Sequence, residues 1–171
     1  MDVKWDYQLK NDQRSNPVVY AEYLDIDKEH IVMPSEEQLK RIFINDGFRL
    51  QTWKRSKDKN GKTILTEDPH WIAVRGGTPL HVDPRYPRYS HHLKVRCDDG
   101  IYCRGLSREE LHLRRGLFYI LDTHSPHQVF HKKNQKSWNV AASVDSHDIL
   151  DKNYVLPMLL EFAKKNDYSE D

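Results

Sequence analysis

Three residues in two short segments of the chain have the types and the spacing to bind one transition-metal ion. His81 and Asp83 stand two positions apart, and His127 lies in a second segment, Thr123 to Val129. On an extended chain, residues i and i+2 point the same way, so His81 and Asp83 can reach one ion together and a neighbouring strand must supply a third ligand. We assign that ligand to His127. Two imidazoles and one carboxylate leave three positions of an octahedral ion open, which suits Fe(II) enzymes that bind a co-substrate and O2 together.

The tripeptide from His81 to Asp83 is a weak signal by itself, because a chain with ten histidines should contain about one His-x-Asp by chance. His127 strengthens it, since this histidine follows a strand-like apolar segment, Gly116 to Asp122. A zinc site on His124, His127 and His131 is an alternative, because positions i, i+3 and i+7 share one helix face. Pro126 and the alternating pattern after it favour a strand instead.

Short strands are expected to position these residues. From residue 48 onward the sequence consists of short apolar or alternating runs separated by turn signals. We expect strands at 49–55, 71–74, 92–97, 101–104, 117–121, 128–131 and 138–144, with turns at Asn60-Gly61, Gly76-Gly77 and Asp98-Asp99-Gly100. Many short strands with regular turns predict a barrel or a sandwich.

Two helices are expected to flank the strands. The first begins at Ser35, which can form a capping box with Gln38, and Gly47 should end it. The second follows Asp145, and Pro157 must kink or restart it. Its expected buried stripe is Ile149, Val155, Leu159, Leu160 and Phe162. We expect one domain, with a lead-in arm, helix and outer strands at 1–65, a core at 66–146 and a C-terminal helix and tail at 147–171.

The charge balance limits the partners. The chain has 27 Lys and Arg against 26 Asp and Glu, a net charge of +1, so no global field draws it to nucleic acid or to an anionic membrane. Arginines are frequent in the core segment, and we interpret them as solvated rather than as a substrate groove. A small-molecule or peptide substrate is expected, a nucleic-acid partner is not favoured, and the oligomeric state stays open.

The sequence also bears on location and redox state. No apolar run approaches the roughly 20 residues of a membrane span, and residues 1–10 lack the apolar stretch of a secretory signal. A cytoplasmic protein is therefore expected. Cys97 and Cys103 flank a turn and could form a disulfide across a hairpin, but reduced thiols are favoured in that compartment.

A longer pattern extends from His81 to Asp145. After His81 come the segment 90–93, Ser-His-His-Leu, the glycine-to-aspartate segment 116–122, His127 at 46 positions after His81 (127 − 81), and Val144-Asp145. This order resembles the double-stranded β-helix core of the Fe(II)/2-oxoglutarate oxygenases, especially the branch of the aspartyl/asparaginyl β-hydroxylases and proline hydroxylases. The resemblance covers 65 (81 to 145) of 171 residues.

The resemblance implies a mainly β fold with flanking helices around a jelly-roll or cupin-like core. It makes His81, Asp83 and His127 the catalytic metal ligands and puts His92 near 2-oxoglutarate. Ser90 stands where that branch has an arginine, and the arginine that it places on the last strand is also missing, with Ser137 or Asn139 at that position. A buried dicarboxylate needs a cation, since an unpaired charge is costly to desolvate. Two nearby cations could replace the missing arginines: Lys136 and Arg88.

The function implied by this resemblance is that of an Fe(II)-dependent dioxygenase. It would use 2-oxoglutarate and O2 to hydroxylate an amino-acid side chain, free or in a protein, or another small polar substrate. Two alternatives stay open: a non-catalytic cupin-like barrel that binds a ligand, and a metalloenzyme that does not use 2-oxoglutarate. Loops such as 48–68 and 82–90 set the substrate, and their shape does not follow from their sequence.

Overall fold

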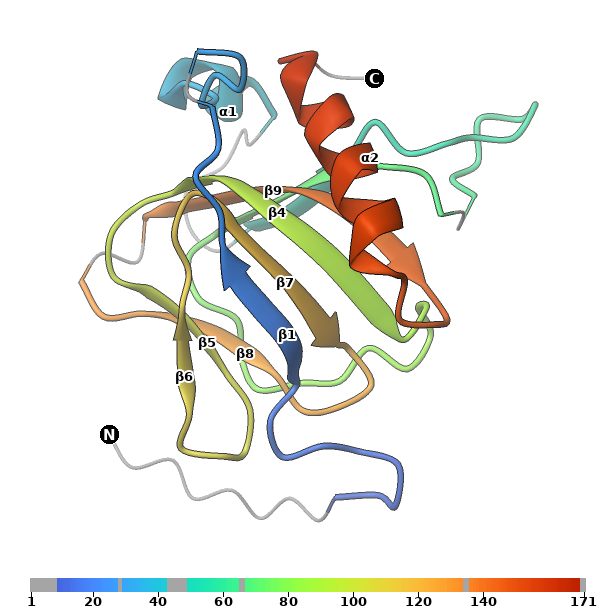
Figure 1. The fold of residues 1–171 in the computed structure, drawn as a ribbon, viewed down its shortest axis with the longest axis vertical. Coiled ribbons are helices and arrows are strands. Elements are labelled where there is room, and N and C mark those ends of the chain that lie inside the picture. The colour runs from blue at the N-terminus through green and yellow to red at the C-terminus, as the bar shows by residue number, and fades with distance from the viewer. Residues whose placement is uncertain (1–8, 28, 43–48, 65–66, 134–135, 170–171) are drawn as a thin grey trace.

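Two antiparallel sheets form most of the computed structural model, which describes residues 9–27, 29–42, 49–64, 67–133 and 136–169 (Figure 1). The large sheet contains β1 (Val18–Tyr23), β2 (Arg49–Trp53), β3 (His70–Arg75), β4 (Tyr89–Cys97), β7 (Leu117–Asp122) and β9 (Trp138–Ser146), in the order β1-β7-β4-β9-β3-β2. The small sheet contains β5 (Ile101–Arg104), β6 (Glu110–His112) and β8 (Gln128–His131), in the order β6-β5-β8. The helices of the described part are α1 (Glu36–Ile42) and α2 (Lys152–Lys164). The expected mainly β architecture with flanking helices is confirmed.

The outer face of the large sheet is apolar and supports α2, which crosses it in Figure 1. Leu93 and Val95 of β4 point to this face, as do alternate residues of β9. From α2, the same core receives Val155, Leu159 and Ala163, which are spaced by four residues and therefore lie on one side of the helix.

Helix α2 differs from the expectation at two residues. Pro157 was expected to kink or restart this helix; a restart is wrong, because α2 is one element from Lys152 to Lys164. Pro157 is exposed and lies in the second turn, where it removes the bond to Asn153 and leaves the rest of the helix intact. Ile149 precedes the helix and is exposed, whereas the rest of the expected stripe is buried or packs against the core.

The inner face of the large sheet is mixed in polarity. Ser90 and His92 of β4 pair directly with Leu121 and Tyr119 of β7, so these four side chains share one face. Leu121 and Tyr119 belong to a second buried cluster that includes Ile101 and Cys103 of the small sheet. The space between the two sheets therefore holds polar side chains of β4 as well as apolar ones.

Several local expectations are confirmed. The backbone N–H of Ser35 donates to Gln38 Oε1 (2.8 Å) and that of Gln38 donates to Ser35 Oγ (3.1 Å), which is the expected capping box. The strands at 101–104 and 128–131 have the expected bounds. The expected helix stop, Gly47, lies outside the described residues. Two strands were not expected from the sequence, β1 within the lead-in arm and the three-residue β6.

Cys97 and Cys103 are both free thiols. In the part of the chain that the structure describes, no helix has the length and the apolar character needed to cross a membrane.

Candidate metal centre

The backbone holds the two candidate histidines side by side. The N–H of His81 donates to the carbonyl of His127 (3.0 Å), and the N–H of His127 donates to the carbonyl of His81 (2.9 Å). This pairing continues in both directions, from Thr78 N–H to the Val129 carbonyl and from Asp83 N–H to the Thr123 carbonyl. The segment 78–83 thus extends the small sheet beside β8, and cross-strand partners on one face bring their side chains together.

The three expected ligands converge. Asp83 Oδ2 lies 3.2 Å from Nε2 of His127 and 3.6 Å from Nε2 of His81. The two imidazole rings are 4.2 Å apart between centroids, and the candidate ligand atoms all lie within 4.8 Å of one another. His127 is buried, whereas His81 and Asp83 are half-buried, so solvent or a ligand can approach from one side.

The hydrogen bonds of the two Nδ1 atoms determine which ring nitrogens remain available to an ion. Nδ1 of His81 lies 2.7 Å from the carbonyl of Pro79, and Nδ1 of His127 lies 2.8 Å from the carbonyl of Ser125. A carbonyl only accepts, so Nδ1 carries the proton in both rings. Each ring then offers Nε2 to a metal, and a second partner of this kind fixes the orientation of a metal-binding histidine.

Electrostatics keep Asp83 ionised. Burial by itself would raise the pKa of Asp83, but its hydrogen bonds to His127 and His81 outweigh burial and hold the pKa well below its usual value. The hydrogen bond to Asp83 raises the pKa of His81 against the opposing effect of burial. A metal cation would replace the imidazole protons as the partner of this carboxylate.

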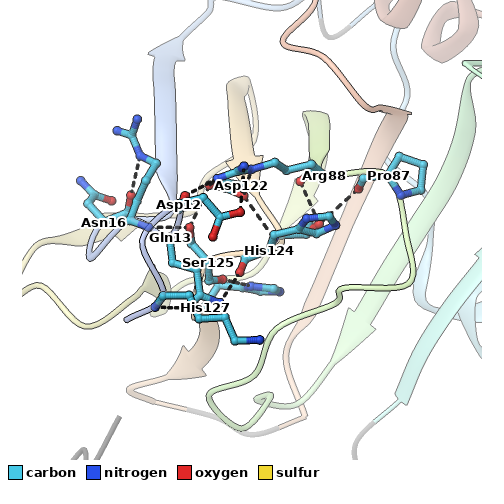
Figure 2. Close-up of polar contacts among 12 residues, drawn as sticks. Asp12, Gln13, Asn16, Pro87, Arg88, Asp122, His124, Ser125 and His127 are labelled. Carbon is cyan, nitrogen blue, oxygen red and sulfur yellow. Dashed lines mark hydrogen bonds and ion pairs between the residues drawn. The ribbon is translucent and has the colours of Figure 1, made fainter. Parts of the chain in front are cut away.

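A buried carboxylate, Asp122, supports the loop that carries His127. Arg88 approaches it with two prongs, Nε to Oδ1 and Nη2 to Oδ2, both at 3.0 Å, and the Ser125 hydroxyl donates to Oδ2 at 2.8 Å (Figure 2). Asp122 has no exposed surface. Arg88, a candidate from the sequence for the co-substrate, is therefore engaged by Asp122.

Ser90 and His92 lie on the inner face next to this loop. The Ser90 hydroxyl donates to Asp145 Oδ1 (3.0 Å) and lies 2.6 Å from His92 Nε2, which must then be the donor to it. Nδ1 of His92 is buried and has no hydrogen-bond partner among the described residues. Burial, followed by the charges of Lys94 and nearby histidines, places the pKa of His92 well below its usual value, so the ring is neutral.

Lys94 is a polar residue of this interior that the sequence reasoning missed. Its position follows Ser90 and His92 at spacings of two, so all three share the inner face of β4. Lys94 is only 3 % exposed, and its Nζ has no hydrogen bond or ion pair within the described part of the chain. The ammonium lies 5.1 Å from the centroid of the Tyr119 ring, and burial lowers its pKa. The sequence feature that could have indicated Lys94 is its place between two apolar residues of a predicted strand, Leu93 and Val95.

The remaining sequence candidates lie elsewhere. Asn139 is buried and accepts a hydrogen bond from the Cys97 thiol (3.3 Å), and Lys136 is exposed just before β9. Asn139 pairs with Cys97 at one end of β9, and Asp145 pairs with Ser90 at the other end. At about 3.3 Å per residue, Asn139 and Asp145 are roughly 20 Å apart. The Ser90 end is the one next to His127, so Lys136 and Asn139 are placed far from the candidate ligands.

The alternative zinc site on a helix is wrong. His131 lies in strand β8, and His124 lies in the preceding loop, where its Nε2 contacts the carbonyl of Tyr86 (2.9 Å). His91, the neighbour of His92, lies on the outer face of the large sheet and is buried there. Its Nδ1 is 3.1 Å from the Val144 carbonyl, and its Nε2 accepts the N–H of Leu150 (3.0 Å).

Comparison with known proteins gives no relative: the sequence matches no family model, and no curated protein matches it. The geometry must therefore carry the functional inference. It offers two imidazole nitrogens and one carboxylate oxygen that lie close together at a half-buried site. Such a set can hold a divalent ion and leave positions for other ligands.

Proposed function

We propose that this chain is a non-haem Fe(II) dioxygenase that uses 2-oxoglutarate and O2 to hydroxylate an amino-acid side chain or another small polar substrate. The observation that carries the proposal is the convergence of His81, Asp83 and His127, with both Nε2 atoms turned toward the carboxylate. Structural zinc prefers a closed shell of four ligands, commonly with thiolates, whereas two histidines and one carboxylate are typical of Fe(II) sites with open positions.

The strand connections support a double-stranded β-helix as the finer description of the fold. From β3 onward the chain passes repeatedly between the large and the small sheet, with β4 in the large one, β5 and β6 in the small one, then β7, β8 and β9 in alternation. Two sheets linked in this way are typical of jelly rolls and cupins. The candidate ligands lie on the small sheet, at the end where β4 begins and β7 ends.

Lys94 is the residue that we propose as the anchor of the distal carboxylate of 2-oxoglutarate. An unpaired buried cation is costly, and an anion from outside would complete it. The sequence pointed to Lys136 or Arg88, but Lys136 is exposed at the far end of β9 and Arg88 is held by Asp122. The bound iron would supply the activation of O2, while the chain holds the co-substrate and shields it from water.

The proposal is tested by anaerobic reconstitution with Fe(II), followed by an optical titration with 2-oxoglutarate. The wild type should bind one Fe(II) and develop a visible metal-to-ligand charge-transfer band that saturates. His81→Ala and Asp83→Ala should lose Fe(II) binding, because each removes one of three ligands. Failure of the wild type to bind Fe(II) would contradict the proposed function.

The anchor is tested in the same titration. Lys94→Met should keep Fe(II) but weaken 2-oxoglutarate at least tenfold, because the buried cation is lost. Lys136→Ala is the matched control, since it removes an exposed lysine and should leave both affinities within about twofold. Equal 2-oxoglutarate affinity in Lys94→Met and the wild type would exclude Lys94 as the anchor.

One observation favours a second candidate function. The resembling enzymes hold 2-oxoglutarate with an arginine on the last strand, and this chain has Ser137 and Asn139 in that region, both buried. A metalloenzyme that does not use 2-oxoglutarate would still bind Fe(II) at the same three ligands. It would show no charge-transfer band and would form no succinate with any substrate.

A further inference from the structure

We propose that Asp122, Arg88 and Ser125 form a positioning network that fixes the orientation of His127 and makes the N-terminal segment 12–17 part of the metal centre. The inference rests on the proposed metal centre and concerns residues that do not touch the ion. Its basis is a continuous path of contacts, drawn in Figure 2, from Asp122 through Ser125 to the His127 ring.

Ser125 is the link next to the ligand. Its carbonyl accepts the Nδ1–H of His127 at 2.8 Å, which decides which ring nitrogen faces the ion. Its hydroxyl donates to Asp122 Oδ2 and accepts the backbone N–H of Arg14, each at 2.8 Å. Because Ser125 is fully buried and held from two sides, its carbonyl has one position, and so has the imidazole plane of His127.

Asp122 is the centre of the network. Its two oxygens accept the two prongs of Arg88, the Ser125 hydroxyl and the backbone N–H of His124 (3.1 Å). A carboxylate with no exposed surface is stable only when such donors surround it. The Asp122 N–H donates to the Pro17 carbonyl (2.8 Å), so the residue also joins β7 to the start of β1.

The N-terminal segment closes the network from outside. Gln13 Nε2 donates to the carbonyl of His124 (2.8 Å), and Arg88 Nη2 donates to the carbonyl of Asp12. At Gly105, a Cβ would stand 2.4 Å from Pro17 Cδ and 2.8 Å from the Pro126 carbonyl, so no side chain fits between these segments. Residues 12–17 therefore pack directly against the loop that precedes His127.

Ser125 is therefore expected to affect metal affinity through the position of His127, and not only the stability of the fold. Without its hydroxyl, Ser125 loses the bonds to Asp122 Oδ2 and to the Arg14 N–H, while its backbone N–H still donates to the Asp122 carbonyl (3.1 Å) and its own carbonyl remains. Outer partners of metal-binding histidines typically contribute 10- to 100-fold to metal affinity. We therefore expect Ser125→Ala to weaken metal binding about tenfold.

Co(II) is the probe, because its visible d–d bands report both occupancy and ligand geometry. The wild type, Ser125→Ala and the control Ser146→Ala are titrated with Co(II), and the metal-free proteins are melted. Ser146 is a matched control, because its buried hydroxyl also donates to a carboxylate, Glu67 Oε1 (2.6 Å), and accepts a backbone N–H, that of Asp148 (3.2 Å). Both variants should melt at similarly lowered temperatures, but only Ser125→Ala should lose about tenfold in Co(II) affinity and change the d–d spectrum.

Two further measurements cover the remaining outcomes. Proton–nitrogen-15 spectra of the metal-free proteins should show a His127 Nδ1–H that exchanges slowly with solvent in the wild type and in Ser146→Ala, and faster in Ser125→Ala, because its acceptor carbonyl is then less firmly held. If Ser125→Ala does not fold, Arg88→Lys replaces it. That variant keeps the charge but loses the two-pronged contact to Asp122, and it should weaken Co(II) at least threefold.

The inference and the proposed function fail in different ways. A wild type that binds no Co(II) or Fe(II) contradicts the metal centre itself. Unchanged Co(II) affinity in Ser125→Ala, or in Arg88→Lys if that replaces it, overturns the positioning network and leaves the metal centre standing. Equal losses of affinity in Ser125→Ala and Ser146→Ala also overturn it, because they would show that global stability alone is responsible.

Discussion

At the scale of single residues, backbone carbonyls decide the chemistry of the imidazoles. Pro79 and Ser125 each accept an Nδ1–H, two residues before the histidine concerned, so the same local arrangement occurs on both sides of the site. This repetition turns both Nε2 atoms toward Asp83. A ligand set that is oriented by its own backbone needs little reorganisation when an ion binds.

The charge of the Asp122 carboxylate should make the stability of the fold depend on pH. Burial alone would raise its pKa, but the hydrogen bonds from Arg88 and Ser125 lower it further than burial raises it. A carboxyl whose pKa is lower in the folded chain adds stability above its unfolded value near 4, and that stability is lost as the pH falls through the folded value. Asp122→Asn should therefore lower the free energy of unfolding by about 1 to 3 kcal/mol at pH 7.

The measurement is urea unfolding of the metal-free wild type and Asp122→Asn at several pH values. The difference between the two proteins should be full at pH 7 and should shrink as the pH is lowered below about 4. A difference that stays constant down to acid pH would mean that the Asp122 charge does not contribute.

The candidate ligands could be predicted from the sequence, whereas their surroundings could not. His81 and Asp83 follow from the period of two in an extended chain, and the structure brings His127 to them. The burial of Lys94 could be recognised only from the register of β4. A lysine in a strand is usually solvated, and the neighbouring strands decide which way it points. Arg88 looked free for a co-substrate, and only tertiary contacts show that Asp122 holds it.

At the scale of elements, the sequence missed two edge strands, β1 and β6, although it predicted two others, β2 and β8. Strands β5 and β8 have the expected bounds, whereas β1 and β6 each pair with a single strand and contain no fully buried residue. An edge strand needs no apolar alternation, because solvent can satisfy its outer residues. The lead-in arm therefore gave no periodic signal, although it contains β1 and the segment that contacts the His127 loop.

Gly105 tests that contact between elements. Gly105→Ala puts a Cβ against Pro17, Ser15 and the Pro126 carbonyl, and such overpacking typically costs about 1 to 3 kcal/mol. Gly61→Ala is the control, because its Cβ meets nothing within 4 Å and the cost is the positive φ of 78° alone. Urea unfolding should show a loss in both, but Co(II) titration should show weaker binding only in Gly105→Ala. Normal Co(II) affinity in that variant would separate the N-terminal segment from the metal centre.

At the scale of the whole molecule, stability and function occupy different faces of the large sheet. The outer face and α2 form an apolar core that includes Leu93, Val144 and Leu159. The inner face carries Ser90, His92 and Lys94, which are buried, and Nδ1 of His92 has no hydrogen-bond partner among the described residues. Natural proteins tend to keep such costly groups where activity needs them.

This division predicts opposite effects for two buried substitutions. Leu159→Ala leaves a cavity under α2 and should lower the free energy of unfolding by about 2 to 4 kcal/mol, with unchanged Fe(II) and 2-oxoglutarate affinity. Lys94→Met removes an unpaired buried cation and should raise the free energy of unfolding by about 1 to 3 kcal/mol, even though it abolishes the anchor. Urea unfolding of the metal-free proteins measures both. A more stable Lys94→Met would show that the buried ammonium costs stability, as expected of a group kept for a ligand. A less stable one would mean that contacts inside the fold, such as that with the Tyr119 ring, already stabilise it.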